Sequence, residues 1–133
     1  MRHTPWVEPA LEAADLLVPM PLSGVRLRER GFNQALELAR HLCPEKTQAH
    51  TLMRREQSVQ QVGKSRNERL TNVHGSFWVH PDHVQAVRGR HVVVVDDVMT
   101  TGASLFEAAR ALKVAGAAHI TGLVFARTPA HPN

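Results

Sequence analysis

The most distinctive hydrophobic pattern in the chain is a run of four consecutive valines, Val92 to Val95, within a predicted strand at His91 to Val95. Successive side chains of a strand point to opposite faces, so a strand without alternation must be covered on both faces. Such strands are typical of the centre of a parallel sheet that carries helices on both sides. The valine run therefore predicts the central strand of an α/β sheet.

Apolar residues spaced three and four positions apart predict two amphipathic helices. The first begins after Gly31 and ends before Pro44, which cannot continue a helix. The second extends from Gly102 to about Ala115 and is followed by Gly116, a typical residue after a helix C-terminus. The predicted buried positions are Phe32, Ala35, Leu36, Ala39, Leu42 and Cys43 in the first helix, and Leu105, Ala108, Ala109 and Leu112 in the second.

Shorter segments complete the predicted order of elements. The polar segment Arg54 to Asn67 has neither helical nor strand periodicity and is expected to be an exposed, mobile loop. The remaining elements are helices at Glu8 to Ala14 and Glu68 to Val73, and strands at Leu16 to Val18, Thr51 to Met53, Ser76 to Val79 and Ile120 to Ala126. Because strands and helices alternate along 133 residues, the sequence predicts a single α/β domain with an open, mainly parallel twisted sheet flanked by helices.

Positive charge is concentrated in one part of the chain. The formal net charge is +4, but residues 26–69 carry ten Lys or Arg and five Asp or Glu, a net charge of +5. A polyanion is therefore expected to meet this part of the molecule first. The single cysteine, Cys43, excludes an internal disulfide and a cysteine zinc site. Since no apolar run is as long as a membrane span and no signal-peptide stretch is present, we expect a cytoplasmic protein without membrane insertion.

The residues directly after the valine run change abruptly in character. Asp96 and Asp97 follow the predicted strand, and residues 98–104 lead into the predicted helix. In an open parallel sheet, ligands bind beyond the carboxyl ends of the strands. The small and hydroxyl-bearing residues of this loop could close around an anion, with backbone amides and the helix dipole directed at it. The loop is therefore predicted to hold a phosphate group.

The two aspartates require partners other than this phosphate, because a carboxylate repels an anion that it touches. Ribose hydroxyls or a magnesium ion would be suitable partners. A sugar phosphate would thus satisfy both the loop and the aspartates. Two other interpretations remain open, namely ordinary acidic residues at a helix N-terminus and a pair of carboxyl groups for acid–base catalysis.

The motif itself resembles that of a known class of enzymes. The segment Val92 to Ser104, VVVVDDVMTTGAS, resembles the phosphoribosyl pyrophosphate (PRPP) motif of type I phosphoribosyltransferases. The segments Val18 to Ala39 and Gln61 to Phe77 more narrowly resemble the ComF competence-protein family. The resemblance extends from about Leu16 to Thr128 and implies a phosphoribosyltransferase fold. Because full-length ComF members begin with a cysteine-rich zinc ribbon, residues 1–133 are expected to form one phosphoribosyltransferase-like domain without those N-terminal elements, as a fragment or as a short natural form.

The resemblance also assigns roles to individual residues. Asp96 and Asp97 would hold the ribose and Mg2+, directly or through water, and would be catalytic residues together with Lys64. Lys64 belongs to the predicted loop Arg54 to Asn67, which corresponds to the mobile hood of the active site. The substrate-binding residues would be Asp96, Asp97, Val98, Met99, Thr100, Thr101, Gly102, Ala103 and Ser104, together with Arg26 and Arg30.

The pyrophosphate loop of the family corresponds to Pro19 to Gly24, and the arginines at 26, 28 and 30 follow it. Cations and backbone donors are the groups that a pyrophosphate needs. The peptide bonds before Pro19 and Pro21 are candidates for the cis form, which would turn backbone amides toward the anion.

The sequence therefore predicts a protein that binds PRPP with Mg2+ and, if it is an enzyme, transfers the phosphoribosyl group to a nucleobase or an amine. The alternative is a non-catalytic protein of the DNA-uptake system that binds PRPP or single-stranded DNA, with competence proteins as partners. An ATPase P-loop at Gly63 to Ser65 is disfavoured, because Ser58 replaces the first glycine of that motif. The cluster His80, Asp82 and His83 is interpreted as a surface turn, since Pro81 interrupts it.

Overall fold

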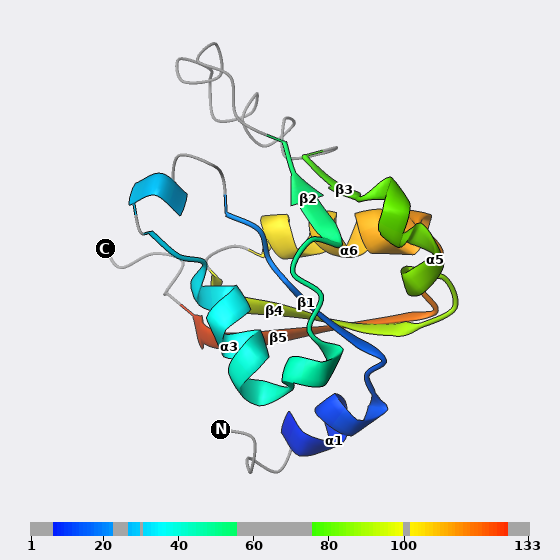
Figure 1. Ribbon diagram of the computed structural model, residues 1–133, viewed down its shortest axis with the longest axis horizontal. Coiled ribbons are helices and arrows are strands. Elements are labelled where there is room, and N and C mark those ends of the chain that lie inside the picture. The colour runs from blue at the N-terminus through cyan, green and yellow to red at the C-terminus, as the bar shows by residue number, and fades with distance from the viewer. Residues whose placement is uncertain (1–6, 23–26, 30, 56–75, 100–101, 128–133) are drawn as a thin grey trace.

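The computed structural model describes residues 7–22, 27–29, 31–55, 76–99 and 102–127 (Figure 1). Its elements are α1 (Val7–Ala13), β1 (Leu16–Pro19), α3 (Gln34–Leu42), η1 (Pro44–Lys46), β2 (Leu52–Arg54), β3 (Phe77–Val79), η3 (Pro81–His83), α5 (Val84–Val87), β4 (His91–Met99), α6 (Ala103–Val114) and β5 (His119–Arg127). The predicted helix Glu68 to Val73, most of the predicted loop and Lys64, Arg26, Arg30, Thr100 and Thr101 lie outside the described residues.

The main sheet has three parallel strands in the order β1, β4, β5. β1 pairs with β4 from Leu16 opposite Val92 to Pro19 opposite Val95. β5 pairs with β4 from His119 opposite His91 to Arg127 opposite Met99. The valine run therefore lies in the central strand, as its lack of alternation predicts.

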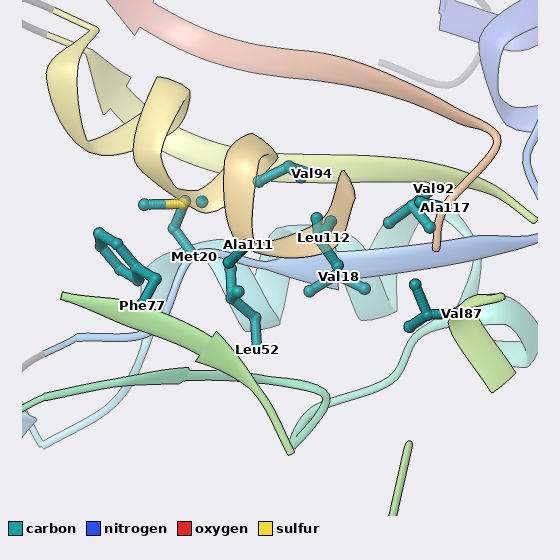
Figure 2. Packing of buried hydrophobic residues seen from close by; sticks show 11 residues of the cluster. Val18, Met20, Leu52, Phe77, Val87, Val92, Val94, Ala111, Leu112 and Ala117 are labelled. Carbon is teal, nitrogen blue, oxygen red and sulfur yellow. The ribbon is translucent and has the colours of Figure 1, made fainter. Parts of the chain in front are cut away.

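Both faces of this central strand are covered, and the four valines have no exposed surface. Val92 and Val94 belong to the α6-side cluster, which consists of Val18, Met20, Leu52, Phe77, Val87, Val92, Val94, Ala108, Ala111, Leu112 and Ala117 (Figure 2). Val93 and Val95 belong to the α3-side cluster, which consists of Leu11, Ala14, Leu17, Ala39, Leu42, Cys43, Val93 and Val95. Burying a valine side chain stabilises a fold by about 1.5–3 kcal/mol. The valine run therefore stabilises the packing on both faces of the sheet, against α6 and against α3.

β2 and β3 form a separate antiparallel sheet of two strands, with Leu52 opposite Val79 and Arg54 opposite Phe77. This small sheet lies on the α6 side of the main sheet (Figures 1 and 2). Leu52 and Phe77 point from it into the α6-side cluster. A two-stranded sheet is marginal alone, so its packing against α6 accounts for its stability.

Most of the residues predicted to be buried in α3 are buried in the structure. Ala35, Ala39 and Leu42 are buried, and Cys43 is 1% exposed, as expected for a core thiol. Phe32, however, is 48% exposed, so its prediction as a core residue is wrong. The reason is that α3 begins at Gln34, which leaves Phe32 in the preceding turn and outside the helical periodicity.

Helix α6 packs with Ala108 and Leu112 fully buried, whereas Phe106 and Val114 face solvent. Gly116 follows the helix with φ of 105°, the left-handed conformation expected of a glycine C-terminal cap. Glu107 is buried, and its carboxylate accepts a hydrogen bond of 2.6 Å from Arg110 Nη2. This hydrogen bond raises the pKa of the Arg110 guanidinium.

Three smaller observations complete the description. In the described ranges there is no cis peptide bond, so the cis form expected before Pro19 and Pro21 is wrong. β1 includes Pro19, one residue beyond the predicted end at Val18, because β1 is at the edge of the three-stranded sheet, where a proline can be accommodated without a ladder amide. Among the helices of the described ranges, none is both long and apolar enough to cross a bilayer.

Candidate functional site

The candidate site lies at the edge of the sheet where β1 and β4 end. Because these strands are parallel and in register, the chain after Pro19 and the end of β4 leave the sheet at the same edge. α6 begins at Ala103, so only residues 100–102 separate it from the end of β4. The predicted aspartates and the start of α6 are therefore held at one edge (Figure 1).

β4 is longer than predicted, since it continues through Asp96 and Asp97 to Met99. The placement of the two acids immediately after the strand is thus wrong. β5 runs beside β4 as far as Arg127, with Asp96 opposite Val124, and this backbone pairing outweighs the low strand preference of aspartate. Val98 and Met99, predicted to bind substrate, are likewise the last residues of the strand.

The position of the aspartates inside a strand separates their side chains. Val92 and Val94 face the α6 side, and Val93 and Val95 face the α3 side. Continued alternation directs Asp96 to the α6 side and Asp97 to the α3 side. Both are half-buried. They therefore form two acceptors on either side of the sheet edge rather than one closely spaced acid pair.

The residue before α6 is a glycine in the left-handed conformation. Gly102 precedes the helix with φ of 83° and is buried. It offers no side chain as a cap, and its carbonyl accepts a hydrogen bond of 2.9 Å from the Phe106 amide. Ala103 and Ser104 are half-buried in the first turn. A helix N-terminus of this kind carries partial positive charge and directs amides outward, which suits a phosphate.

The chain directly after β1 is held beside the end of the valine run. The Met20 amide donates to the Val95 carbonyl at 2.8 Å, immediately before Asp96. Asn33 Nδ2 donates to the Met20 carbonyl at 3.1 Å, while Asn33 Oδ1 accepts from the amides of Ala35 and Leu36 at 3.0 and 3.3 Å. Asn33 was not among the predicted site residues. The signal that could have identified it is an asparagine directly before a helical apolar run, the usual N-terminal cap.

The predicted cationic residues are described only in part. Arg28 is exposed. Arg54 lies over the Phe77 ring at 5.4 Å from its centroid, and Arg55 is exposed, at the end of β2 where the predicted hood begins. Arg54 is thus the last residue of β2, paired with Phe77, so the prediction that the loop begins at Arg54 is wrong.

The carboxylates at the edge suit a hard cation that shares its ligands with a substrate. In the part of the chain that the structure describes, no three His, Cys, Asp or Glu side chains gather as a metal site. Mg2+ is commonly held by one or two carboxylates, with water and substrate phosphates completing its shell. Because Asp96 and Asp97 face opposite sides of the strand, either one could supply a single carboxylate ligand to Mg2+ that arrives with a phosphorylated ligand.

The cluster His80, Asp82 and His83 lies in the predicted turn. His80 Nδ1 accepts from the Asp82 amide at 3.1 Å, and His83 Nδ1 lies 3.1 Å from Thr51 Oγ1. His80 therefore caps η3, whereas His83 contacts the buried Thr51 that precedes β2.

Comparison with known proteins identifies the family of this chain. Residues 20–132 match the phosphoribosyl transferase domain, so the chain belongs to this family. It is 39% identical over 103 residues to the competence protein ComFC of Bacillus subtilis (strain 168), covering 77% of this chain and 40% of that protein. It is 34% identical over 123 residues to the DNA utilization protein YhgH of Escherichia coli (strain K12), covering 89% of this chain and 52% of that protein. The chain thus spans about half or less of the length of these relatives.

A comparison of structures finds the purine phosphoribosyltransferase from Pyrococcus horikoshii Ot3. The TM-score is 0.49 and the sequence identity 16%, over 92% of this chain and 75% of that chain. The family assignment rests on the sequence match and on the parallel sheet with helices on both faces.

Proposed function

We propose that this chain binds PRPP together with Mg2+ at the carboxyl edge of its sheet. The observation that carries the proposal is the parallel pairing of β1 with β4, which brings Asp96, Asp97, the Gly102 turn and the chain after Met20 to one edge. The membership of residues 20–132 in the phosphoribosyl transferase domain family supports it.

The ligand has three polar parts, and the edge offers a partner for each. The terminal phosphate would lie at the start of α6, against Thr100 to Ser104. The ribose hydroxyls would donate to Asp96 and Asp97, which are acceptors when ionised. The pyrophosphate would lie toward the chain after β1, with Arg26 and Arg30 as cations.

A phosphoribosyl transfer at this edge would break the bond between the anomeric carbon and the pyrophosphate oxygen, which leaves with the electron pair. A nitrogen of a nucleobase or an amine would supply the electrons of the new bond. The developing positive charge on the sugar resembles that of glycoside hydrolysis. Mg2+, when bound, supplies charge neutralisation of the leaving pyrophosphate. Lys64 remains our candidate for a second cation at the leaving group.

Calorimetric titration with PRPP tests the proposal. We expect saturable binding that weakens at least about tenfold when Mg2+ is removed, because the metal offsets repulsion between the aspartates and the phosphates. ATP at the same concentration serves as a control for general binding of polyphosphates. Absence of PRPP binding, or equal affinity for ATP, would contradict the proposal. Release of pyrophosphate in a screen of nucleobases and amines would then separate an enzyme from a binding protein.

Single-stranded nucleic acid is a second candidate ligand, at the opposite edge of the sheet. The loops before β4 and after α6 meet there through a hydrogen bond of 2.8 Å from the Gly89 amide to the Gly116 carbonyl. Arg88 and Arg90 are exposed on the loop before β4, and Lys113 is exposed in the last turn of α6. Within the described ranges no carboxylate pairs with these three cations, since the recorded ion pairs join other residues. Lys113 Nζ donates to the Ala118 carbonyl at 3.1 Å. Exposed cations of this kind favour contact with a phosphate backbone.

Two imidazoles lie at the same edge. The rings of His91 and His119, which are opposite each other in β4 and β5, have centroids 5.8 Å apart. His119 is exposed, whereas His91 is half-buried and its Nε2 lies 2.8 Å from Thr121 Oγ1. The exposed His119 imidazole could stack on an unpaired base. The name of the relative YhgH, a DNA utilization protein, is consistent with such a ligand.

Charge reversal separates the two edges. Arg90→Glu should weaken binding of a fluorescent single-stranded oligonucleotide about tenfold at low salt and leave PRPP affinity unchanged. Arg28→Glu, the control at the other end of the sheet with the same change of charge, should not weaken oligonucleotide binding. Fluorescence anisotropy measures both. If the two variants lose oligonucleotide affinity equally, binding depends on net charge only and the second candidate is rejected.

A further inference from the structure

β5 is the outermost strand of the main sheet on the side opposite β1 (Figure 1). Its side away from β4, the free side of β5, has no partner strand in the part of the chain that the structure describes. The strand is nine residues long and keeps one register with β4, without a bulge. Alternate residues of such a strand direct their amides and carbonyls away from the sheet. β5 therefore presents a long row of hydrogen-bonding groups to a further strand.

The free side of β5 lacks the features that usually protect an outer strand. Outer strands are normally short, charged, bulged or interrupted by proline, which prevents them from pairing with other chains. Residues 120–126 contain neither a charged residue nor a proline. The apolar side chains of Leu123, Val124 and Phe125 are only half-buried. The composition of β5 therefore favours pairing with another strand.

An exposed apolar part of α6, the α6 ledge, borders the free side of β5 and consists of Leu105, Phe106 and Ala109. Leu105 packs so closely on Gly122 of β5 that a Cβ added at this glycine would lie 3.0 Å from Leu105 Cδ2. Ala109, one turn further along the helix, lies on the same side of α6 as Leu105. Phe106 is the neighbour of Ala109 on the helix surface and is 80% exposed. The side of α6 next to the free side of β5 is therefore apolar and open to solvent.

We propose that the free side of β5 binds β5 of a second copy of this chain in antiparallel orientation, so that their three-stranded sheets form one continuous sheet. A two-fold pairing that uses all nine residues puts the middle residue, Leu123, on the axis, opposite Leu123 of the second copy. Gly122 then lies opposite Val124, and Thr121 lies opposite Phe125. A small residue meets a large one in both pairs, which is the arrangement that fills the space between facing positions.

The same pairing covers the α6 ledge. α6 packs on both β4 and β5, so it lies above the space between these strands. Because adjacent strands are about 4.8 Å apart, the α6 helices of two paired copies would lie about 10 Å apart, a distance at which helices pack. A two-fold axis perpendicular to the sheet keeps both helices on one face, where Phe106 of each copy would enter the contact. A second copy thus covers both the strand and the phenylalanine, whereas an unrelated extended peptide would cover only the strand.

Sedimentation velocity over a range of protein concentrations measures this association. We expect the unchanged chain to approach twice its monomer mass as its concentration rises. Hydrogen exchange should then slow in peptides from β5, whose outward amides become paired, and stay the same in peptides from β4, which is paired on both sides in each copy. A chain that stays monomeric, or a dimer without added protection in β5, overturns the proposal.

Complementary charges at Leu123 test the two-fold register. Leu123→Lys and Leu123→Glu each place like charges opposite each other, so each variant alone should raise the dissociation constant of the dimer at least about tenfold. An equal mixture of the two variants should restore the dimer, because the facing charges are then opposite. Single variants that dimerise like the unchanged chain, or a mixture of folded variants that stays monomeric, would reject the pairing around Leu123 and with it the proposal.

A second pair of variants avoids the half-buried position of Leu123, which packs partly against the α3-side cluster. Phe106→Glu changes an exposed side chain and should raise the dissociation constant of the dimer at least about fivefold. Val114→Glu is its matched control on the same helix, because Val114 is also exposed and follows Ala111, which packs with Leu52 of the small sheet (Figure 2). It should change the dissociation constant by less than about twofold. If both variants weaken the dimer equally, or neither does, the α6 ledge is not in the interface and the proposal is overturned.

Discussion

Replacing Asp96 and Asp97 together by asparagine should lower the affinity for PRPP at least about 100-fold. A hydrogen bond to a charged group contributes about 1.5–3 kcal/mol, and the two carboxylates accept from the ribose in our proposal. The loss of two such bonds corresponds to a factor of about 100 or more in the dissociation constant. The replacements have almost the same shape, and both side chains are only half-buried. The fold should therefore be retained.

Calorimetry with PRPP and Mg2+ measures this effect, and circular dichroism confirms that the double variant is folded. Asp82→Asn makes the same chemical change at an exposed position in η3 and should leave the affinity unaltered. Because Asp96 and Asp97 face opposite sides of the strand, each single variant should lose part of the affinity and neither should equal the double variant. Unchanged PRPP binding in the double variant would show that the aspartates are not the ribose acceptors.

The largest effect on stability is expected for Leu112→Ala. Leu112 is fully buried in the α6-side cluster, between α6 and the valines of β4 (Figure 2). Truncating a buried leucine removes its transfer free energy and leaves a cavity, with a total cost of about 2–5 kcal/mol. We expect a loss of about 3 kcal/mol in the free energy of unfolding.

Urea denaturation followed by circular dichroism measures this loss. Val114→Ala on the same helix is the matched control, because Val114 is 75% exposed and its truncation should change the free energy of unfolding by less than about 0.5 kcal/mol. A similar loss for both variants would mean that α6 is stabilised by its helical backbone and not by packing on the sheet.

The central layer of the fold could be predicted from the sequence because its signals are local and redundant. Four valines without alternation identified the central strand, and both of its neighbours are parallel as expected. The glycine after α6 is in the left-handed conformation that its position predicts. The residues of the candidate edge were also proposed from the sequence, because two acidic residues follow directly on the valine run, and their role in binding stays a prediction.

What could not be predicted depends on contacts between distant segments. The extension of β4 through Asp96 and Asp97 is due to β5, whose backbone continues alongside it to Arg127. The separation of the two carboxylates to opposite faces follows from that extension. The bond from Asn33 to Met20 also has no local signal, because only the paired end of β1 places that carbonyl within reach.

The pairing of β1 with β4 also determines when, during folding, the edge that is proposed to bind the ligand can form. At the start of these strands the His91 amide donates to the Asp15 carboxylate, 76 residues apart in sequence, so the pair closes a large loop. Closing such a loop costs chain entropy before the strand contacts form and offset that cost. The pairing of β1 with β4 is therefore a late event in folding. A nascent chain that ends before β4 has no edge for a ligand to occupy. A ligand bound there would protect the domain against global unfolding rather than stiffen a single loop.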